Sequence, residues 1–231
     1  MATPVIAWKN NLRNSGATIT ASSTASGYAA SNVRDFRPFT LWKSNSTTSP
    51  SYVDVDLGAS GSADADSIVV VNHNMVSEGG QLKVYADTVT PPVAVAQAAY
   101  TPTSDACDLK TFTAPGAKRY WRVEFLKGSP FSVAPYAGVI MLGLKMTMPE
   151  YVAPDIDPFL HEIEVASAPS GESGHALGVA LRGIRRRGSL HFGGPAGLVR
   201  TFLTSDFNAF LTQRYKRCEP WAFQLDSADV G

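Results

Sequence analysis

Short segments in which hydrophobic and polar residues alternate run through the chain from Met1 to about Glu150. In Val53 to Leu57, the valines and the leucine fall on one face and two aspartates on the other, which is the period of a half-buried strand. Further strands are predicted at Ser67 to Asn72, Gln81 to Ala86, Arg119 to Leu126 and Gly138 to Met148. Clusters of Gly, Pro, Ser and Asn separate these segments, so residues 1–150 are predicted to form a β-sandwich.

A second unit is predicted over residues 151–231, after a segment that is rich in proline and in acidic residues, Pro149 to Pro158. Such a segment is typical of an extended linker, because proline fixes φ and offers no backbone donor to a sheet. Beyond the linker, His161 to Ala166 alternates, Ala176 to Phe192 has the pattern of one or two strands, and Trp221 to Leu225 has that of a closing strand.

One stretch of this second unit has the period of an amphipathic helix. Its apolar residues recur at three- and four-residue spacing: Val199, Phe202, Leu203, Phe207, Phe210 and Leu211. A unit of about eighty residues is near the lower limit for a self-sufficient core, so we expect it to complete that core against a neighbour. The predicted fold class is therefore mainly β, an N-terminal jelly-roll β-sandwich followed by a small α+β module with one amphipathic helix.

The overall charge gives no indication of a nucleic-acid partner. Twenty Lys and Arg residues balance twenty Asp and Glu residues, and the pI is about 6.9, so the basic field of a non-specific nucleic-acid binder is absent. No apolar run of membrane-spanning length occurs, and the first residues lack the apolar core of a secretory signal. We expect a soluble protein that folds in a reducing cytoplasm, with Cys107 and Cys218 both free and buried.

A search for catalytic patterns finds no nucleotide-binding loop, nucleophile elbow or metal-binding helix motif. The four histidines are scattered, and each is expected to have a backbone partner. Asp54 with Asp56, and Glu162 with Glu164, have the spacing of one strand face, and a solvated face is the favoured interpretation over a general acid and base. We therefore predict neither enzymatic activity nor a cofactor.

A basic run, Arg182 with Arg185 to Arg187, is the strongest local charge feature. Because guanidinium forks match carboxylates at protein interfaces, we predict contacts with acidic residues of another copy, either Asp155 and Asp157 of the linker or Glu162 and Glu164. The residues predicted at the subunit interface are Arg182, Arg185, Arg187, Phe202 and Phe210.

Aromatic residues in loops provide a different hypothesis, because their rings can stack on sugars. Tyr28, Phe36 and Tyr136 are the residues predicted to bind carbohydrate. Trp42 stands where a strand begins and is expected in the core.

Several pieces of the first unit together resemble a known family. They are Ala17 to Ser23, Gly27 to Val33, Asp35, Thr40 to Trp42, Val53 to Gly58 and Val71 to Asn74. In order and spacing they resemble the discoidin-like (F5/8 type C, galactose-binding-like) jelly rolls, and Val71 to Asn74 is similar to the variant in bacteriophage tail proteins. The resemblance covers roughly Ala7 to Met148.

This resemblance implies a sandwich whose loops at one end often hold a carbohydrate, frequently with a structural calcium ion. By similarity, Asp35 and Thr40 match positions that supply calcium oxygens, and Trp42 matches the core tryptophan. The glutamate that usually completes the calcium site is missing from Gly138 to Lys145, so no metal is predicted.

From Pro158 onward, the layout resembles the belt part of distal-tail or tail-tip ring proteins of phages, although the order of the two units is reversed. The resemblance implies a structural component of a phage tail, assembled in the host cytoplasm and located in the virion. Its expected form is a homo-oligomeric ring, most simply a hexamer, joining the tail tube to the hub, tip or receptor-binding apparatus. The alternative is a carbohydrate-binding module or adhesin that recognises host surface glycans.

Overall fold

The computed structural model describes residues 4–148, 161–167, 180–187, 207–210, 212 and 222–224. Its elements, in chain order, are β1 (Val5–Ala7), η1 (Asn11–Arg13), β2 (Thr18–Ala21), η2 (Ala30–Arg34), β3 (Trp42–Lys43), β4 (Ser51–Asp56), β5 (Ser67–His73), β6 (Gln81–Asp87), β7 (Val95–Tyr100), β8 (Cys107–Thr111), β9 (Tyr120–Leu126), β10 (Tyr136–Gly143), β11 (Lys145–Thr147), β12 (His161–Ser167), β13 (Ala180–Arg187) and β14 (Ala222–Gln224). The η elements are short 3₁₀ helices, and residues 207–210 and 212 are α-helical. No helix in these described ranges is long and apolar enough to cross a membrane.

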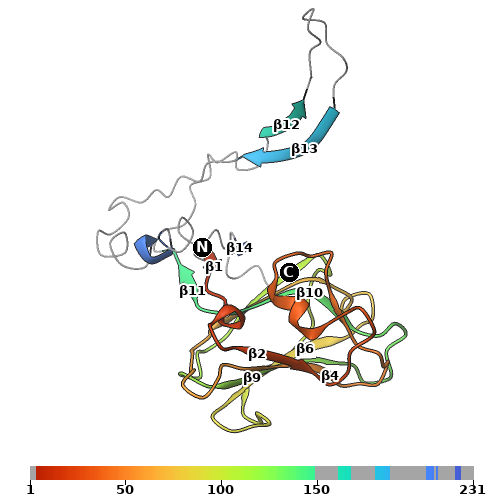
Figure 1. Ribbon diagram of the computed structural model, residues 1–231, viewed down its shortest axis with the longest axis vertical. Helices are drawn as coiled ribbons and strands as arrows, with labels where there is room; N and C mark the ends of the chain where they lie inside the picture. The colour runs from red at the N-terminus through yellow and green to blue at the C-terminus, as the bar shows by residue number, and fades with distance from the viewer. Residues whose placement is uncertain are drawn as a thin grey trace, which may run out of the picture.

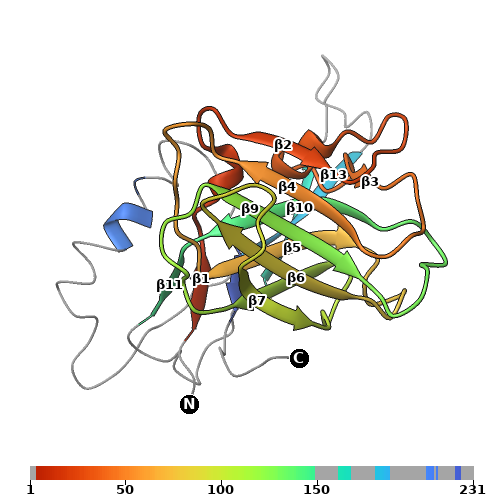
Figure 2. The same cartoon turned by 90° about the horizontal axis from the view of Figure 1, so that it is seen from below.

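Two antiparallel sheets form the body of the protein (Figure 1). One has the strand order β2-β4-β9-β6-β7 and the other the order β3-β10-β5-β8. Figure 2 looks onto the five-stranded sheet, with β2 and β7 at its two edges. The described part of the chain is thus a mainly β protein with a sandwich of the jelly-roll kind, which confirms the predicted fold class.

The core lies between these two sheets, where alternating positions of each strand turn inward. In β4, β6 and β9 every second residue is buried, as the alternating sequence predicts. Trp42 and Trp121 are fully buried, and Trp42 packs on Phe125 with ring centroids 5.2 Å apart. Trp42 is therefore a core residue, as expected.

A third sheet joins the two ends of the chain, with the strand order β11-β1-β14. Ile6 of β1 pairs with Met146 on one side and Phe223 on the other. Phe210 packs into a small core with Ile6, Met146 and Met148, and is only 7% exposed. Phe210 is thus buried against β1 and β11 of its own chain, and its predicted role at a subunit interface stays a prediction.

The hairpin of β12 and β13 contains the basic run. Arg186 pairs with Glu162, and Arg185 with Ile163, in an antiparallel register. The strand with the acidic pair is thus the neighbour of the basic strand within one chain, and contacts of the arginines with another copy stay a prediction. Arg182 and Arg187 also lie on β13. Phe202 and the linker over 149–160 are outside the described residues, and a ring-forming role for this unit stays a prediction.

Most predicted strands of the first unit occur close to their expected positions, but one is divided. The segment Gly138 to Met148 forms two strands, β10 and β11, that belong to different sheets. The break falls at Leu144, whose carbonyl accepts the N–H of Trp8, and Asp66 Oδ1 accepts the next N–H, that of Lys145. These two contacts explain why one continuous apolar segment changes sheets.

Strands β7 and β8 were not predicted, because neither has a regular alternation of apolar and polar residues. β8 is an edge strand, and Cys107 at its start is exposed. The prediction that both cysteines are buried is therefore wrong for Cys107, and Cys218 lies outside the described residues.

Candidate functional site

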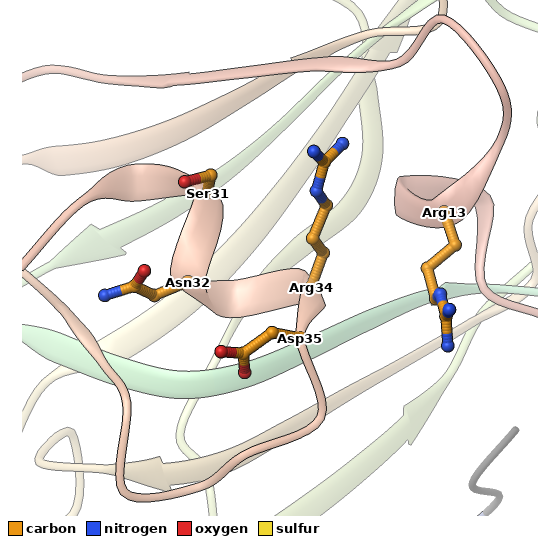
Figure 3. Close-up of a pocket in the computed structure, with 5 residues that line it drawn as sticks. All are labelled: Arg13, Ser31, Asn32, Arg34 and Asp35. Carbon is orange, nitrogen blue, oxygen red and sulfur yellow. The ribbon is translucent and has the colours of Figure 1, made fainter.

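A polar pocket opens between η1 and η2, with a volume of about 560 Å³. Its lining residues are Arg13, Ser31, Asn32, Arg34 and Asp35. Figure 3 shows that Arg13 comes from η1 on one side, and that the other four come from η2 and the residue that follows it. Every lining side chain can form hydrogen bonds, and three of the five are charged.

The first wall of the pocket is fixed to the sandwich by Asn10, which precedes η1. Its side-chain oxygen accepts the N–H of Leu12 at 3.1 Å and caps the helix. The same side chain donates to the carbonyl of Ile140 at 3.2 Å and accepts the N–H of Leu142 at 3.3 Å. Because Leu12 is fully buried, η1 cannot turn freely, and Arg13 leaves it at a defined place.

The second wall, η2, is held by one buried residue and two side-chain contacts. Val33 is fully buried in the core and anchors the helix. Asn32 donates from Nδ2 to the carbonyl of Leu41 at 3.0 Å, and Arg34 donates from Nη1 to the carbonyl of Ala17 at 3.2 Å. The side chains of Asn32 and Arg34 are therefore oriented by the protein itself.

Asp35 closes the pocket and is bound within its own loop. Its Oδ1 accepts the N–H of Arg37 at 2.8 Å, and its Oδ2 accepts the hydroxyl of Thr40 at 2.6 Å. The structure thus brings together Asp35 and Thr40, the two residues that match calcium ligands.

The residues present do not fit a calcium ion. The Thr40 hydroxyl donates toward Asp35, both carboxylate oxygens already accept hydrogen bonds, and two arginines share the pocket. The described residues contain no cluster of three or more His, Cys, Asp or Glu side chains able to hold a metal. A Ca²⁺ site requires about six oxygen ligands.

Phe36, directly after Asp35, has an unusual backbone conformation and contacts Arg13 of the pocket. Its φ is +60°, a left-handed value that is rare for a bulky residue and that marks local strain. The side chain packs on the outer face of the four-stranded sheet, beside Val69, Val139 and Met141. The guanidinium of Arg13 lies over the Phe36 ring, 4.9 Å from its centroid. The strained residue thus provides the surface on which Arg13 rests.

The three aromatic residues predicted to bind sugar occupy different environments, and none lines the pocket. Tyr28 is 40% exposed, whereas Phe36 and Tyr136 are partly buried. Phe39, in the loop between Asp35 and Thr40, is 76% exposed. A role in sugar binding stays a prediction for all three.

Sequence reasoning did not select four of the five lining residues: Arg13, Ser31, Asn32 and Arg34. One signal was available, because Val33 is a single apolar residue within a polar run. Such a pattern is typical of a surface turn held by one buried anchor. Arg13, which η1 contributes to the opposite side of the pocket, has no local signal in the sequence.

The acidic pair Asp54 and Asp56 lies on one face of β4, as its spacing predicts, and each carboxylate has an arginine partner. Arg122 binds Asp54 through two hydrogen bonds of 2.6 and 2.8 Å, and Arg119 binds Asp56 through two of 2.7 and 3.0 Å. The pKa of Asp56 is lowered, chiefly by its hydrogen bond with Arg119. Both aspartates are therefore ion-pair residues on the outer face of the sheet.

His73 is a buried titratable group away from the pocket. Its Nδ1 accepts the N–H of Met75 at 3.1 Å, which confirms the expected backbone partner, and lies 3.2 Å from Oδ1 of Asp105. Its Nε2 is buried without a partner among the described residues. Burial lowers the pKa of His73, and the nearby carboxylates of Asp105 and Asp108 oppose that shift only in part. Folding therefore favours the neutral form of the His73 imidazole.

No family model and no curated protein matches the chain. Among solved structures, chitosan-binding module 1 from a chitosanase/glucanase of Paenibacillus sp. IK-5 is 23% identical, with a TM-score of 0.47, covering 58% of this chain and 97% of that chain. A module named CpGH89CBM32-6, produced by Clostridium perfringens, is 19% identical, with a TM-score of 0.45 and coverages of 58% and 98%. A Ruminococcus gnavus GH29 fucosidase in complex with fucose is 15% identical, with a TM-score of 0.46 and coverages of 60% and 27%.

Proposed function

We propose that the protein is a non-catalytic carbohydrate-binding module, and that its ligand binds in the pocket between η1 and η2. The observation that carries this proposal is the chemistry of the lining, which consists entirely of hydrogen-bonding side chains, two of which, Asn32 and Arg34, are held in place by backbone carbonyls. A saccharide presents neighbouring hydroxyl groups, each of which donates and accepts. Arginine and amide side chains can match such pairs with two parallel bonds.

The size of the pocket supports the same function. Its volume of about 560 Å³ is within the range of roughly 300 to 1,000 Å³ that is usual for small-molecule sites. Small sugars fit such a space, with the rest of a longer chain outside it. Jelly rolls are also a common scaffold of lectin domains, a likeness of fold that is consistent with this function.

Exposed aromatic residues in the segments next to η2 supply a stacking surface for a longer glycan. Phe39 belongs to the loop that begins at Asp35, and Tyr28 lies two residues before the start of η2. At 76% and 40% exposure, both rings have apolar area available to the C–H face of a sugar. Tyr28 was selected from the sequence, and Phe39 takes the place of the partly buried Phe36 in this proposal.

Glycan-array screening followed by calorimetry tests the proposal. Asn32→Ala should weaken binding of an array-positive sugar by about tenfold, the effect of losing a hydrogen bond worth roughly 1.5 kcal/mol. The exposed Asn45, outside the pocket lining, supplies the matched control Asn45→Ala, which should bind as the wild type does. A flat array, or equal effects of the two substitutions, would refute the proposal.

The phage-tail function, the hexameric ring with tube, hub and tip proteins, and the virion location stay predictions from the resemblance. They are compatible with a carbohydrate-binding module, because a tail adhesin would use the same pocket on a host glycan.

A further inference from the structure

We propose that the pocket selects an acidic saccharide, one in which a sugar ring carries a carboxylate. This inference rests on the proposed function and specifies its ligand class. It follows from an imbalance of charge in the lining, which contains two guanidinium groups, those of Arg13 and Arg34, and a single carboxylate, that of Asp35.

The two pocket arginines differ from the arginines of the sheet face. Arg119 and Arg122 each form an ion pair with an aspartate of β4. Among the described residues, neither Arg13 nor Arg34 forms an ion pair with any carboxylate. The positive charge of these two side chains is thus left for a ligand.

Asp35 forms no ion pair with either arginine, and its oxygens are directed into its own loop. One oxygen accepts the N–H of Arg37 and the other accepts the hydroxyl of Thr40. In Figure 3 the Arg34 side chain extends away from Asp35. The lining therefore carries a net charge of +1, from two arginines and one aspartate.

Both guanidinium groups are supported in a way that leaves donors free. Arg34 uses one Nη1 hydrogen on the carbonyl of Ala17, and Arg13 rests on the Phe36 ring. A guanidinium has five N–H donors, so each group retains an edge that can bind a carboxylate through two bonds. Ser31 and Asn32, in the same lining, can then bind the ring hydroxyls.

The test uses pairs of saccharides that differ only in charge. Oligosaccharides of polygalacturonate, alginate and hyaluronan are compared with their carboxyl-reduced forms, in which each uronic acid becomes the neutral sugar of the same stereochemistry. Sulfated neutral oligosaccharides form a third arm. We expect at least one uronic acid oligosaccharide to bind about tenfold tighter than its reduced form, and more weakly as salt is added, because salt screens exposed charges.

Variants connect this preference to the pocket. Arg13→Ala and Arg34→Ala should each remove most of the difference between the acidic and reduced forms. Arg37→Ala is the matched control, because the Arg37 side chain is exposed nearby and does not line the pocket. Arg34→Lys keeps the charge but not the two-point contact, so it should weaken binding even if Arg34→Ala does not fold.

The outcomes separate this inference from the proposed function. Equal binding of acidic and reduced forms, with no effect of either arginine substitution, would overturn the acidic selectivity and leave carbohydrate binding intact. Binding restricted to the sulfated arm would also overturn it, in favour of a sulfate ligand. Failure of every acidic, reduced and neutral sugar to bind would overturn both.

Discussion

Arg122 of β9 binds Asp54 of β4 at two points, with Nε 2.6 Å from Oδ1 and Nη2 2.8 Å from Oδ2. The guanidinium also stacks on Tyr52, 3.7 Å from the ring centroid. Because β4 and β9 are adjacent strands at the centre of the five-stranded sheet, this contact joins them on the face opposite the core.

Substituting Asp54 by Asn should lower the free energy of unfolding by about 1 kcal/mol, the upper end for partly exposed ion pairs, since the side chains are 16% and 27% exposed. Chemical denaturation at neutral pH measures the change. Asp56→Asn is the matched control and should lower the free energy of unfolding by less, because the ion pair of Asp56 with Arg119 is more exposed, with side chains at 36% and 32%. A larger loss for Asp56→Asn would contradict this ranking.

Stability should decrease on mild acidification because of His73. Burial lowers the pKa of His73 in the folded state below the ordinary value of 6.5. Below pH 6.5 the unfolded chain therefore binds a proton that the folded protein does not bind, and stability decreases until the lower, folded-state pKa is reached. Denaturation from about pH 5 to about pH 7.5 should show a smaller slope for His73→Gln than for the wild type. An unchanged slope would exclude His73 as the cause.

Phe210 should stabilise the single chain. Phe210→Ala removes a buried ring from the cluster with Ile6 and Met146, so we expect a loss of about 3 kcal/mol. The exposed Asn208 in the same helical segment supplies the control Asn208→Ala, with little effect. Light scattering run in parallel tests the alternative, in which Phe210 holds subunits together. If Phe210→Ala abolished an oligomer without lowering the stability of dilute protein, the residue would act between subunits after all.

Phe36 should affect binding through Arg13. Phe36→Leu keeps an apolar side chain against Val139 and Met141 but removes the aromatic surface under the guanidinium. Cation–π contacts at exposed sites contribute about 0.5 to 1 kcal/mol, so the affinity for an acidic saccharide should decrease by roughly two- to fivefold. Calorimetry on the wild type, on each single variant and on the double variant Phe36→Leu with Arg13→Ala provides the check. The Phe36 effect should vanish in the double variant, and an undiminished effect there would show that Phe36 acts independently of Arg13.

Several strands of the sandwich, among them β4, β6 and β9, could be predicted from the sequence because each of them carries its own alternating pattern. Val53 and Val55 alternate with aspartates, and that period alone gives both the strand and its buried face. The prediction of a single strand over Gly138 to Met148 was wrong, because tertiary contacts set the strand ends there. A hydrogen bond from Trp8 to the carbonyl of Leu144 accompanies the division of this apolar run into two strands.

The pocket was harder to predict, because 3₁₀ helices of three and five residues are too short to show a period. Arg13 and Arg34 belong to different segments, and the contacts of Asn10 with β10 help bring them together. The resemblance did select Asp35 and Thr40, which are in contact, but the hydrogen bonds they form differ from those of metal ligands.

Nuclear magnetic resonance tests the location of the ligand most directly. Backbone and arginine side-chain signals are followed while an array-positive saccharide is added to the uniformly labelled protein. The account predicts that the largest shifts fall on Arg13 and on residues 31–35, with those of β4 and β9 unchanged. Saturable shifts confined to any other part of the chain would contradict a binding site between η1 and η2.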